Sequence, residues 1–233
     1  MSRVKGEGEM ANLAFFRGER RNAPNEMTID ELLAKKGDYG FLEREHSFIQ
    51  WLFPVMANTG VNGYAVKLGR AEARAMRGDL TVARRVVAGY RMMLDFYGLE
   101  LADEQTGEVK RAAHYAERYE HLNYSSHNYL RMSRILFSLG ELGFRTYKAP
   151  LVAHWEREIV DNKLVTNAKH SFEMFWKFTL EEDSEAYARH TMEIASDLEP
   201  SVFFADEKDE KAAEADERVE DERPAKKGRK DEL

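Results

Sequence analysis

The chain has 233 residues, of which 43% are hydrophobic and 33% charged, with a net charge of −7 and no cysteine. This length and hydrophobic content suffice for one sizeable buried core. The negative charge disfavours nucleic-acid binding through the folded part, and the lack of cysteine excludes disulfides, thiolate zinc sites and cysteine nucleophiles. The first residues lack the apolar segment of a secretory signal, and no stretch is apolar enough to span a bilayer. We therefore expect a soluble intracellular protein.

Composition divides the chain into three parts. Residues 1–10 are polar and rich in glycine and glutamate, so we expect them to be flexible. From Asp206 onward, twelve acidic and eight basic residues give a net charge of −4 and leave almost nothing to bury. Such a segment cannot repay the entropy cost of folding. The sequence therefore predicts one helical domain over residues 11–204 and a disordered charged tail over residues 205–233.

The first predicted helices lie between residues 28 and 54. Thr28 stands three residues before Glu31, the spacing of a capping box at the start of a helix. Residues 41–53 (FLEREHSFIQWLF) are predicted to form one continuous helix. Pro54 ends it, because proline cannot supply the amide that a further turn requires.

Two longer segments have clear helical periodicity. Apolar residues recur every three or four positions over residues 80–97 and again over residues 127–142. Gly98 and Gly143 stand where C-terminal caps belong. Ser125 or Ser126 is expected to cap the start of the second segment. Further helices are expected at 112–120, 150–162, 168–178 and 184–198.

Strand patterns are nearly missing, since residues 61–66 (VNGYAV) offer the sole candidate. An almost uniform helical period with short connections is typical of a helical bundle. The predicted fold is therefore all-α, a single bundle-like domain of roughly eight helices.

The helix predicted at residues 41–53 combines many apolar side chains with a few polar ones. Positions three and four apart share a helix face, so Glu43, His46, Ser47 and Gln50 are predicted to form one polar stripe. The stripe either bonds to a neighbouring helix or faces solvent, or it lines a small polar pocket with Trp51 among its walls. Both interpretations agree with the pattern.

Glu43 and His46 also match the Glu-x-x-His spacing of carboxylate-bridged di-iron bundles. That chemistry requires two such motifs, and the chain has one. No zinc-protease motif, phosphate-binding glycine loop or nucleophile elbow occurs either. We therefore predict no catalytic residue, no metal and no cofactor, and keep a metal-dependent helical-bundle enzyme as a remote alternative.

Arg131 and Arg134 share one face of their predicted helix with Ser138 and Glu141, opposite the apolar stripe. Their guanidinium groups are suited to an anionic ligand or to a carboxylate such as Glu43. Ion pairs on the surface or between helices are the commoner use of such residues.

Several blocks of sequence resemble the conserved region of the opioid growth factor receptor family, in the family's order, over residues 12–152. The most specific block joins Leu42 and Glu43 to residues 46–54 (HSFIQWLFP). Further matching positions are Asn123, His127, Asn128, Leu130, Arg131 and residues 138–143 (SLGELG). The long repeat region of the vertebrate receptor has no counterpart here.

The resemblance implies a helical domain which, in the vertebrate receptor, is tied to binding the pentapeptide methionine-enkephalin and to restraining cell proliferation. It also implies a location in the cytoplasm and nucleus, with peripheral association with a membrane or with the nuclear envelope. The expected function is a non-enzymatic, peptide-binding growth regulator. A helical scaffold that binds another protein rather than a free peptide is the alternative.

A short amphipathic peptide needs an aromatic groove and a carboxylate for its amine. We hypothesise such a groove beside the helix at residues 41–53. The predicted ligand-binding residues are Glu43, His46, Gln50, Trp51, Tyr90, Tyr97, Arg131 and Arg134.

The end of the tail contains two candidate targeting signals. Lys226, Lys227, Arg229 and Lys230 form a basic cluster of the kind that nuclear import receptors bind. The terminal Lys-Asp-Glu-Leu matches a retrieval signal of the endoplasmic reticulum, which acts only on proteins that enter its lumen. Because no entry signal is recognised, we expect the basic cluster to direct the chain to the nucleus.

Overall fold

The computed structural model of this protein describes residues 10–57, 65–181 and 183–185. Most of the strand candidate at 61–66 and most of the helix expected at 184–198 lie outside these residues. The flexible segment expected at 1–10, apart from its last residue, and the tail at 205–233, with its basic cluster and terminal Lys-Asp-Glu-Leu, lie outside them too.

The described residues form ten α-helices, one two-stranded hairpin and several short 3₁₀ and π turns, which confirms a mostly helical fold. The helices are α1 (Ala11–Arg17), α2 (Ile29–Leu33), α3 (Tyr39–Arg44), α4 (Phe48–Leu52), α5 (Arg70–Arg77), α6 (Leu80–Phe96), α7 (Tyr115–Tyr124), α8 (His127–Glu141), α9 (Lys148–Glu156) and α10 (Lys169–Ser171). The strands are β1 (Leu99–Leu101) and β2 (Val109–Arg111). Shorter turns are η1 (Arg145–Tyr147), η2 (Arg157–Asp161), η3 (Thr166–Ala168), η4 (Phe172–Trp176) and η5 (Lys177–Leu180).

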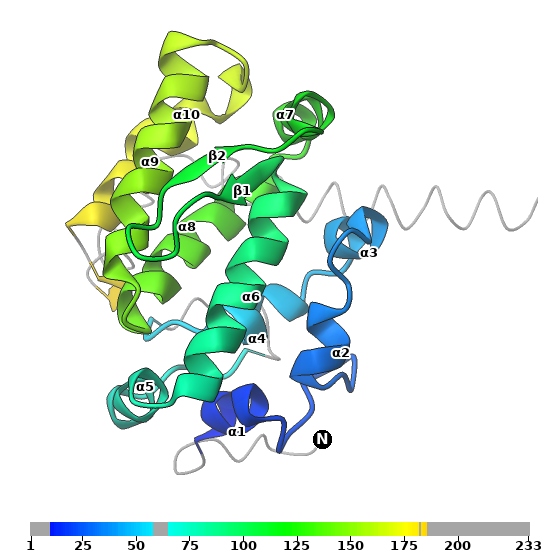
Figure 1. The fold of residues 1–233 in the computed structure, drawn as a ribbon, viewed down its shortest axis with the longest axis vertical. Coiled ribbons are helices and arrows are strands. Elements are labelled where there is room, and N and C mark those ends of the chain that lie inside the picture. The colour runs from blue at the N-terminus through cyan, green and yellow to red at the C-terminus, as the bar shows by residue number, and fades with distance from the viewer. Residues whose placement is uncertain (1–9, 58–64, 182, 186–233) are drawn as a thin grey trace, which may run out of the picture. The chain divides into compact units, whose positions relative to one another are not determined.

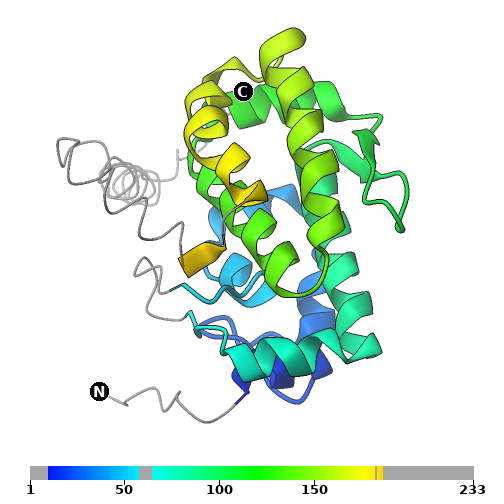
Figure 2. The ribbon, with the colours of Figure 1, turned by 90° about the vertical axis from the view of Figure 1, so that its left-hand side faces the viewer.

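The two longest helices, α6 and α8, and the continuous run of α9 and η2 extend along the described domain (Figure 1). Helices α1 and α5 gather around one end of α6, and α7 lies near its other end (Figure 1). Figure 2 shows α8 and α9 side by side, with the turns after α10 packed against them. No helix of the described part combines the length and apolar character that crossing a bilayer requires.

The caps predicted for the longest helices are present. Gly98 follows α6 with a φ of 79°, and Gly143 follows α8 with a φ of 97°, both in the left-handed region that favours glycine. The predicted capping box of α2 is also confirmed, because Thr28 and Glu31 each accept a hydrogen bond from the other's backbone amide. Ser126 occupies the N-cap position of α8 but makes no capping bond with its side chain.

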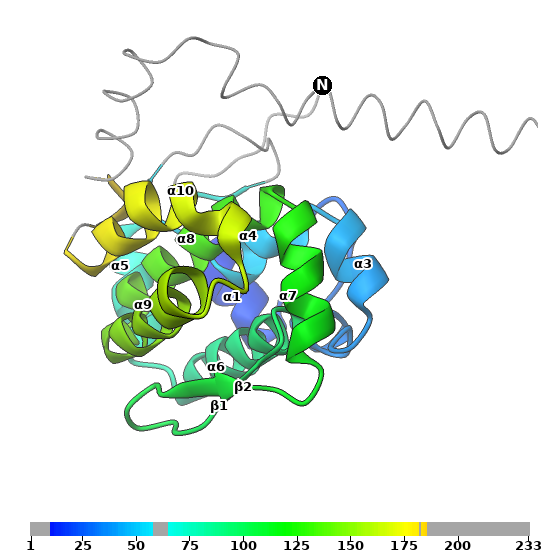
Figure 3. The same ribbon diagram turned by 90° about the horizontal axis from the view of Figure 1, so that it is seen from above.

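A small antiparallel hairpin was missed by the purely helical prediction. Strand β1 pairs with β2 so that Leu99 lies opposite Arg111 and Leu101 opposite Val109. The hairpin covers the outside of α6 and α9 (Figure 3). Each strand has three residues, which is too short for a period of two to be recognised in sequence.

The prediction of one helix over residues 41–53 is wrong, because the chain breaks between α3 and α4. Glu45 is extended, with φ −88° and ψ 120°. The Glu45 carboxylate accepts hydrogen bonds from the backbone amide and the hydroxyl of Ser47, at 2.9 and 2.7 Å. The four polar side chains therefore do not share one face: His46 is exposed, whereas Ser47 and Gln50 are buried.

Arg131 of α8 explains why the helix breaks. Its guanidinium donates to the carbonyl oxygens of Leu42, Glu43 and Glu45 at 2.6, 3.3 and 3.0 Å. In a continuous helix these carbonyls would accept amides four residues further on. Here the buried guanidinium donates the hydrogen bonds in place of those amides. Its positive charge is also attracted to the negative, C-terminal end of the α3 dipole.

The polar face predicted on α8 continues along the same segment. Arg134 donates to the carbonyl oxygen of Phe53 at 2.9 Å, and Glu141 accepts from the backbone amide of Met56 at 2.8 Å. Burial lowers the pKa of Arg134 to about 10, although Glu141 acts in the opposite direction. These polar side chains of α8 therefore position the backbone of residues 42–56.

Gly98 allows a test of how α7 is positioned. A Cβ atom at this residue would lie 2.8 Å from the Cα atom of Tyr115, at the start of α7. We expect Gly98→Ala to lower the free energy of unfolding by at least about 2 kcal/mol, because strain at positive φ adds to this overlap. Gly37→Ala is the matched control, since Gly37 has a φ of 85° and no neighbour within 4 Å. If urea titrations showed the same loss of unfolding free energy in both variants, the steric overlap with Tyr115 would be contradicted.

Arg131 allows a second test. We expect Arg131→Lys to lower the free energy of unfolding by about 2 to 4 kcal/mol, because one ammonium cannot replace a planar group bound to three carbonyls. The control is Arg84→Lys on the exposed face of α6, which should change stability by no more than about 0.5 kcal/mol. Denaturant unfolding measures both variants, and a wild-type midpoint for Arg131→Lys would contradict the assigned role.

Candidate functional site

The aromatic residues predicted to line a groove are core residues in this structure. Trp51, Tyr90 and Tyr97 are exposed by only 2%, 1% and 2%. The indole nitrogen of Trp51 donates to the carbonyl oxygen of Ala23 at 3.0 Å. Gln50 is buried as well. A role for these residues in ligand binding stays a prediction, and the structure places them against the core rather than along an open groove.

Arg131 and Arg134 contact the segment before α8 in sequence. Both side chains donate hydrogen bonds to backbone carbonyls of residues 42–53. Arg131 is 5% exposed, so its guanidinium is not available to an anionic ligand. Glu43 and His46 remain at the surface of the fold, and the structure places them in a cluster of titratable groups.

This cluster, which we call the Glu43 cluster, joins α3, α7 and α8. It consists of Glu43, His46, His121, Ser125, His127 and Asn128. The Glu43 carboxylate lies 3.3 Å from Nε2 of His121 and 3.5 Å from Nε2 of His127, and it accepts the hydroxyl of Ser125. The ring of His46 lies beside that of His127, with 4.9 Å between centroids and an angle of 33° between the ring planes.

The hydrogen bonds of His121 assign its tautomer. Arg118 lies 3.1 Å from Nδ1 of His121 and can only donate, so Nδ1 accepts. The proton of the neutral ring is therefore on Nε2, which faces the Glu43 carboxylate. This orientation lets the imidazole donate to Glu43 without carrying a charge.

Burial and hydrogen bonding compete at the Glu43 carboxyl. Burial acts to raise its pKa, but hydrogen bonds from His121 and Ser125 and the attraction of His127 outweigh burial and hold the pKa well below its usual range. Burial and the nearby Arg131 lower the pKa of His127 to about 4, despite the attraction of Glu43. At neutral pH the cluster therefore holds an ionised carboxylate beside a neutral His127.

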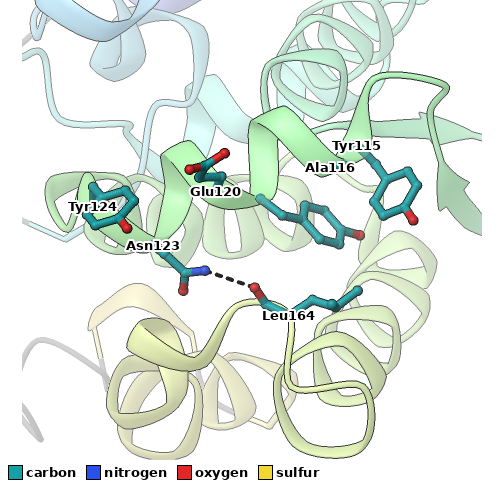
Figure 4. Close-up of a pocket in the computed structure, with 7 residues that line it drawn as sticks. Tyr115, Ala116, Glu120, Asn123, Tyr124 and Leu164 are labelled. Atoms are coloured by element: carbon teal, nitrogen blue, oxygen red, sulfur yellow. Dashed lines mark hydrogen bonds between the residues drawn. The ribbon is translucent and has the colours of Figure 1, made fainter.

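A pocket of about 250 Å³ lies on another side of α7 (Figure 4). Residues 115–124 supply most of its lining, and Leu164 closes it from across the gap. Its lining residues are Tyr115, Ala116, Tyr119, Glu120, Asn123, Tyr124 and Leu164. Three tyrosines, a carboxylate and an amide around this small open hollow place apolar surface beside a few polar groups.

Asn123 fixes the loop that forms the far wall of this pocket. Its side-chain amide donates to the carbonyl oxygen of Leu164 at 2.8 Å (Figure 4). Its side-chain oxygen accepts a hydrogen bond from the backbone amide of Asn167 at 3.2 Å. Its backbone carbonyl oxygen accepts a hydrogen bond from the side-chain amide of Asn167 at 2.8 Å. Three hydrogen bonds thus hold residues 164–167 against α7, so the pocket is formed without a ligand.

Behind the pocket, Tyr119 begins a buried chain of polar groups. Its hydroxyl lies 2.8 Å from Nε2 of His154, which lies 3.8 Å from Glu158. Arg111 binds the Glu158 carboxylate through two hydrogen bonds of 3.0 and 2.6 Å. Burial raises the pKa of Tyr119 and lowers that of His154 to about 4, so both groups are neutral at neutral pH. These two groups therefore add no charge behind the pocket wall.

Apart from Asn123, which is one of the positions that match the family blocks, the pocket residues were not singled out in the sequence. Tyr115 and Tyr119 are four residues apart, and this density of tyrosine in YAERYEHLNY was an available signal. Leu164 carried no such signal, because a loop more than forty residues away completes the hollow. Among the described residues, no three histidine, aspartate or glutamate side chains are placed to hold a metal ion together.

The buried state of His154 predicts a dependence of stability on pH. Its pKa lies near 4 in the folded chain, below the ordinary value of 6.5, so between these values the unfolded chain binds a proton that the folded chain does not. Stability should therefore be full above pH 6.5 and fall as the pH drops towards 4, by on the order of 3 kcal/mol for this residue.

Urea titrations between pH 7 and pH 4.5 measure this effect. We expect His154→Gln to flatten the decline, while His127 contributes to the part that remains. His170→Gln on the exposed surface is the control and should keep the wild-type slope. A wild-type slope in His154→Gln would show that His154 is not the responsible group.

Comparison with known proteins agrees with the blocks seen in the sequence. Residues 5–207 match the opioid growth factor receptor conserved region. The chain is 39% identical over 183 residues to opioid growth factor receptor-like protein 1 of Mus musculus, which is 78% of this chain and 39% of that protein. It is 40% identical over 174 residues to the opioid growth factor receptor of Homo sapiens, which is 74% of this chain and 26% of that protein.

The matched segment spans well under half the length of these relatives. No solved protein structure is significantly similar to the chain. The family match nevertheless covers most of the sequence and includes α7, both walls of its pocket and the Glu43 cluster. By this conserved region, the chain belongs to the opioid growth factor receptor family.

Proposed function

We propose that this chain is a non-enzymatic, receptor-like protein that binds a short peptide in the pocket of α7 and takes part in growth regulation. The pocket, with three tyrosines, Glu120 and Asn123 around about 250 Å³, is the observation that carries the proposal. The names of the relatives, an opioid growth factor receptor and a receptor-like protein, support a peptide as the class of ligand.

Two features of the pocket favour binding. Its far wall is held by the hydrogen bonds of Asn123, so this wall loses little conformational entropy when a ligand binds. The exposed carboxylate of Glu120 lies beside the tyrosine rings of the lining, so the pocket offers a polar contact within apolar surface.

A segment of a larger protein is the second candidate ligand. Tyr124 is 81% exposed and Leu164 is 40% exposed, so apolar surface continues beyond the hollow itself. A free pentapeptide would cover only part of this rim, whereas a protein segment could extend across it.

Fluorescence polarisation with labelled methionine-enkephalin, the peptide that the family resemblance implies, tests the proposal on the full chain. Ala116→Trp fills the pocket from an exposed lining position, so we expect it to weaken binding by about tenfold or more. Ala113→Trp is the control, because Ala113 is exposed just before α7 and does not line the pocket.

Three outcomes are informative. Saturable binding that Ala116→Trp removes and Ala113→Trp keeps supports the proposal. Saturable binding that neither substitution changes places the ligand elsewhere on the chain. An absence of saturable binding contradicts the pentapeptide as ligand, and a labelled longer segment that binds in its place would favour the second candidate.

A further inference from the structure

Beside Tyr115, at one end of the α7 pocket, a tyrosine ring and a buried carboxylate outside the lining hold a cation, and the other end carries the same two kinds of group in the lining itself. At one end, the guanidinium of Arg111 lies over the ring of Tyr115, 4.7 Å from its centroid, and is bound by the Glu158 carboxylate. The protein itself thus shows how this end holds a cation, by an aromatic face and a carboxylate together.

At the other end, Glu120 and Tyr124 form the corresponding pair. They are four residues apart on α7, so they lie next to each other on one helix face. Both side chains are exposed, and Figure 4 shows Tyr124 at the end of the pocket away from Tyr115, with Glu120 one turn of α7 nearer to Tyr115. Among the residues that the structure describes, Glu120 has no basic partner, whereas the neighbouring Glu117 lies 4.0 Å from Arg118.

The chemistry of this end selects one class of ligand group. An ammonium or guanidinium gains both the attraction of the carboxylate and that of the ring face. A neutral group would displace water from the carboxylate without replacing the hydrogen bonds that the water made. An anionic group would be repelled by the carboxylate. The exposed side chain of Leu164, which lines the same pocket, adds apolar surface for the aliphatic stem that carries a basic group.

We propose that the Glu120–Tyr124 end of the pocket binds a basic group of the ligand, a lysine or arginine side chain or an amino terminus. This inference rests on the proposed function, since it names the ligand class of the same pocket. It assigns Glu120 as the partner of the cation and Tyr124 as the aromatic face beside it.

Titration of the isotope-labelled chain with Nα-acetyl-lysine methylamide, followed by amide signals in NMR spectra, tests the inference. The matched probe is Nα-acetyl-norleucine methylamide, which has an aliphatic side chain and no charge. We expect the lysine probe to shift the signals of residues 120–124 and 164 and to bind several times more tightly than the norleucine probe.

The variant Glu120→Gln should weaken binding of the lysine probe by about threefold to tenfold, because it removes the charge and keeps the shape. Glu117→Gln removes a carboxylate on the same helix outside the pocket and should leave binding unchanged. Spectra of each variant without probe confirm that the fold is kept.

Equal binding of the two probes, lysine binding unaffected by Glu120→Gln, or no shift on α7 with either probe would each overturn the inference. These outcomes are separate from those for the proposed function. Pentapeptide binding that Ala116→Trp removes but Glu120→Gln leaves unchanged would keep the proposed function and reject the basic subsite. Lysine binding that depends on Glu120, without pentapeptide binding, would keep the subsite and reject that peptide.

Discussion

The buried guanidinium of Arg131 is the interaction on which the rest of the described domain depends. It donates hydrogen bonds to the carbonyl oxygens at the end of α3 and so allows the chain to turn before α4 begins. A cation in the core is costly unless its donors are satisfied, and here three backbone carbonyls satisfy them. The same turn directs Glu43 towards α7 and α8, so the titratable cluster at the surface follows from a contact in the core.

Helix α7 joins the two polar regions of the structure. One side carries His121, which faces Glu43, and another side carries Asn123, which holds the far wall of the pocket. Tyr119 points inward to His154. Because Gly98 brings the preceding turn directly against the start of α7, the helix has little freedom to shift. Its contacts therefore hold the pocket in one shape, which is a requirement for recognition without large ordering costs.

Local sequence rules were sufficient for the ends of α6 and α8 and for the start of α2, but not for α1 and α5, which were not predicted. The glycines after α6 and α8 and the capping box at Thr28 are decided by residues a few positions apart, and all were predicted. The hairpin of β1 and β2 was not, since its three-residue strands are held by pairing and by burial of Leu99 against the core. The break after α3 was not predicted either, because local periodicity favours a continuous helix there.

The sequence by itself determined the helical class, the main helix ends and the family, because these depend on periodicity, caps and blocks of residues that are contiguous in the chain. Only the tertiary structure decided which polar residues are available. It placed Trp51 and Arg131 in the core, set Glu43 among histidines from α7 and α8, and closed a pocket with Leu164. The physical reason is that burial and hydrogen bonding between residues forty or more positions apart leave no local pattern in the sequence.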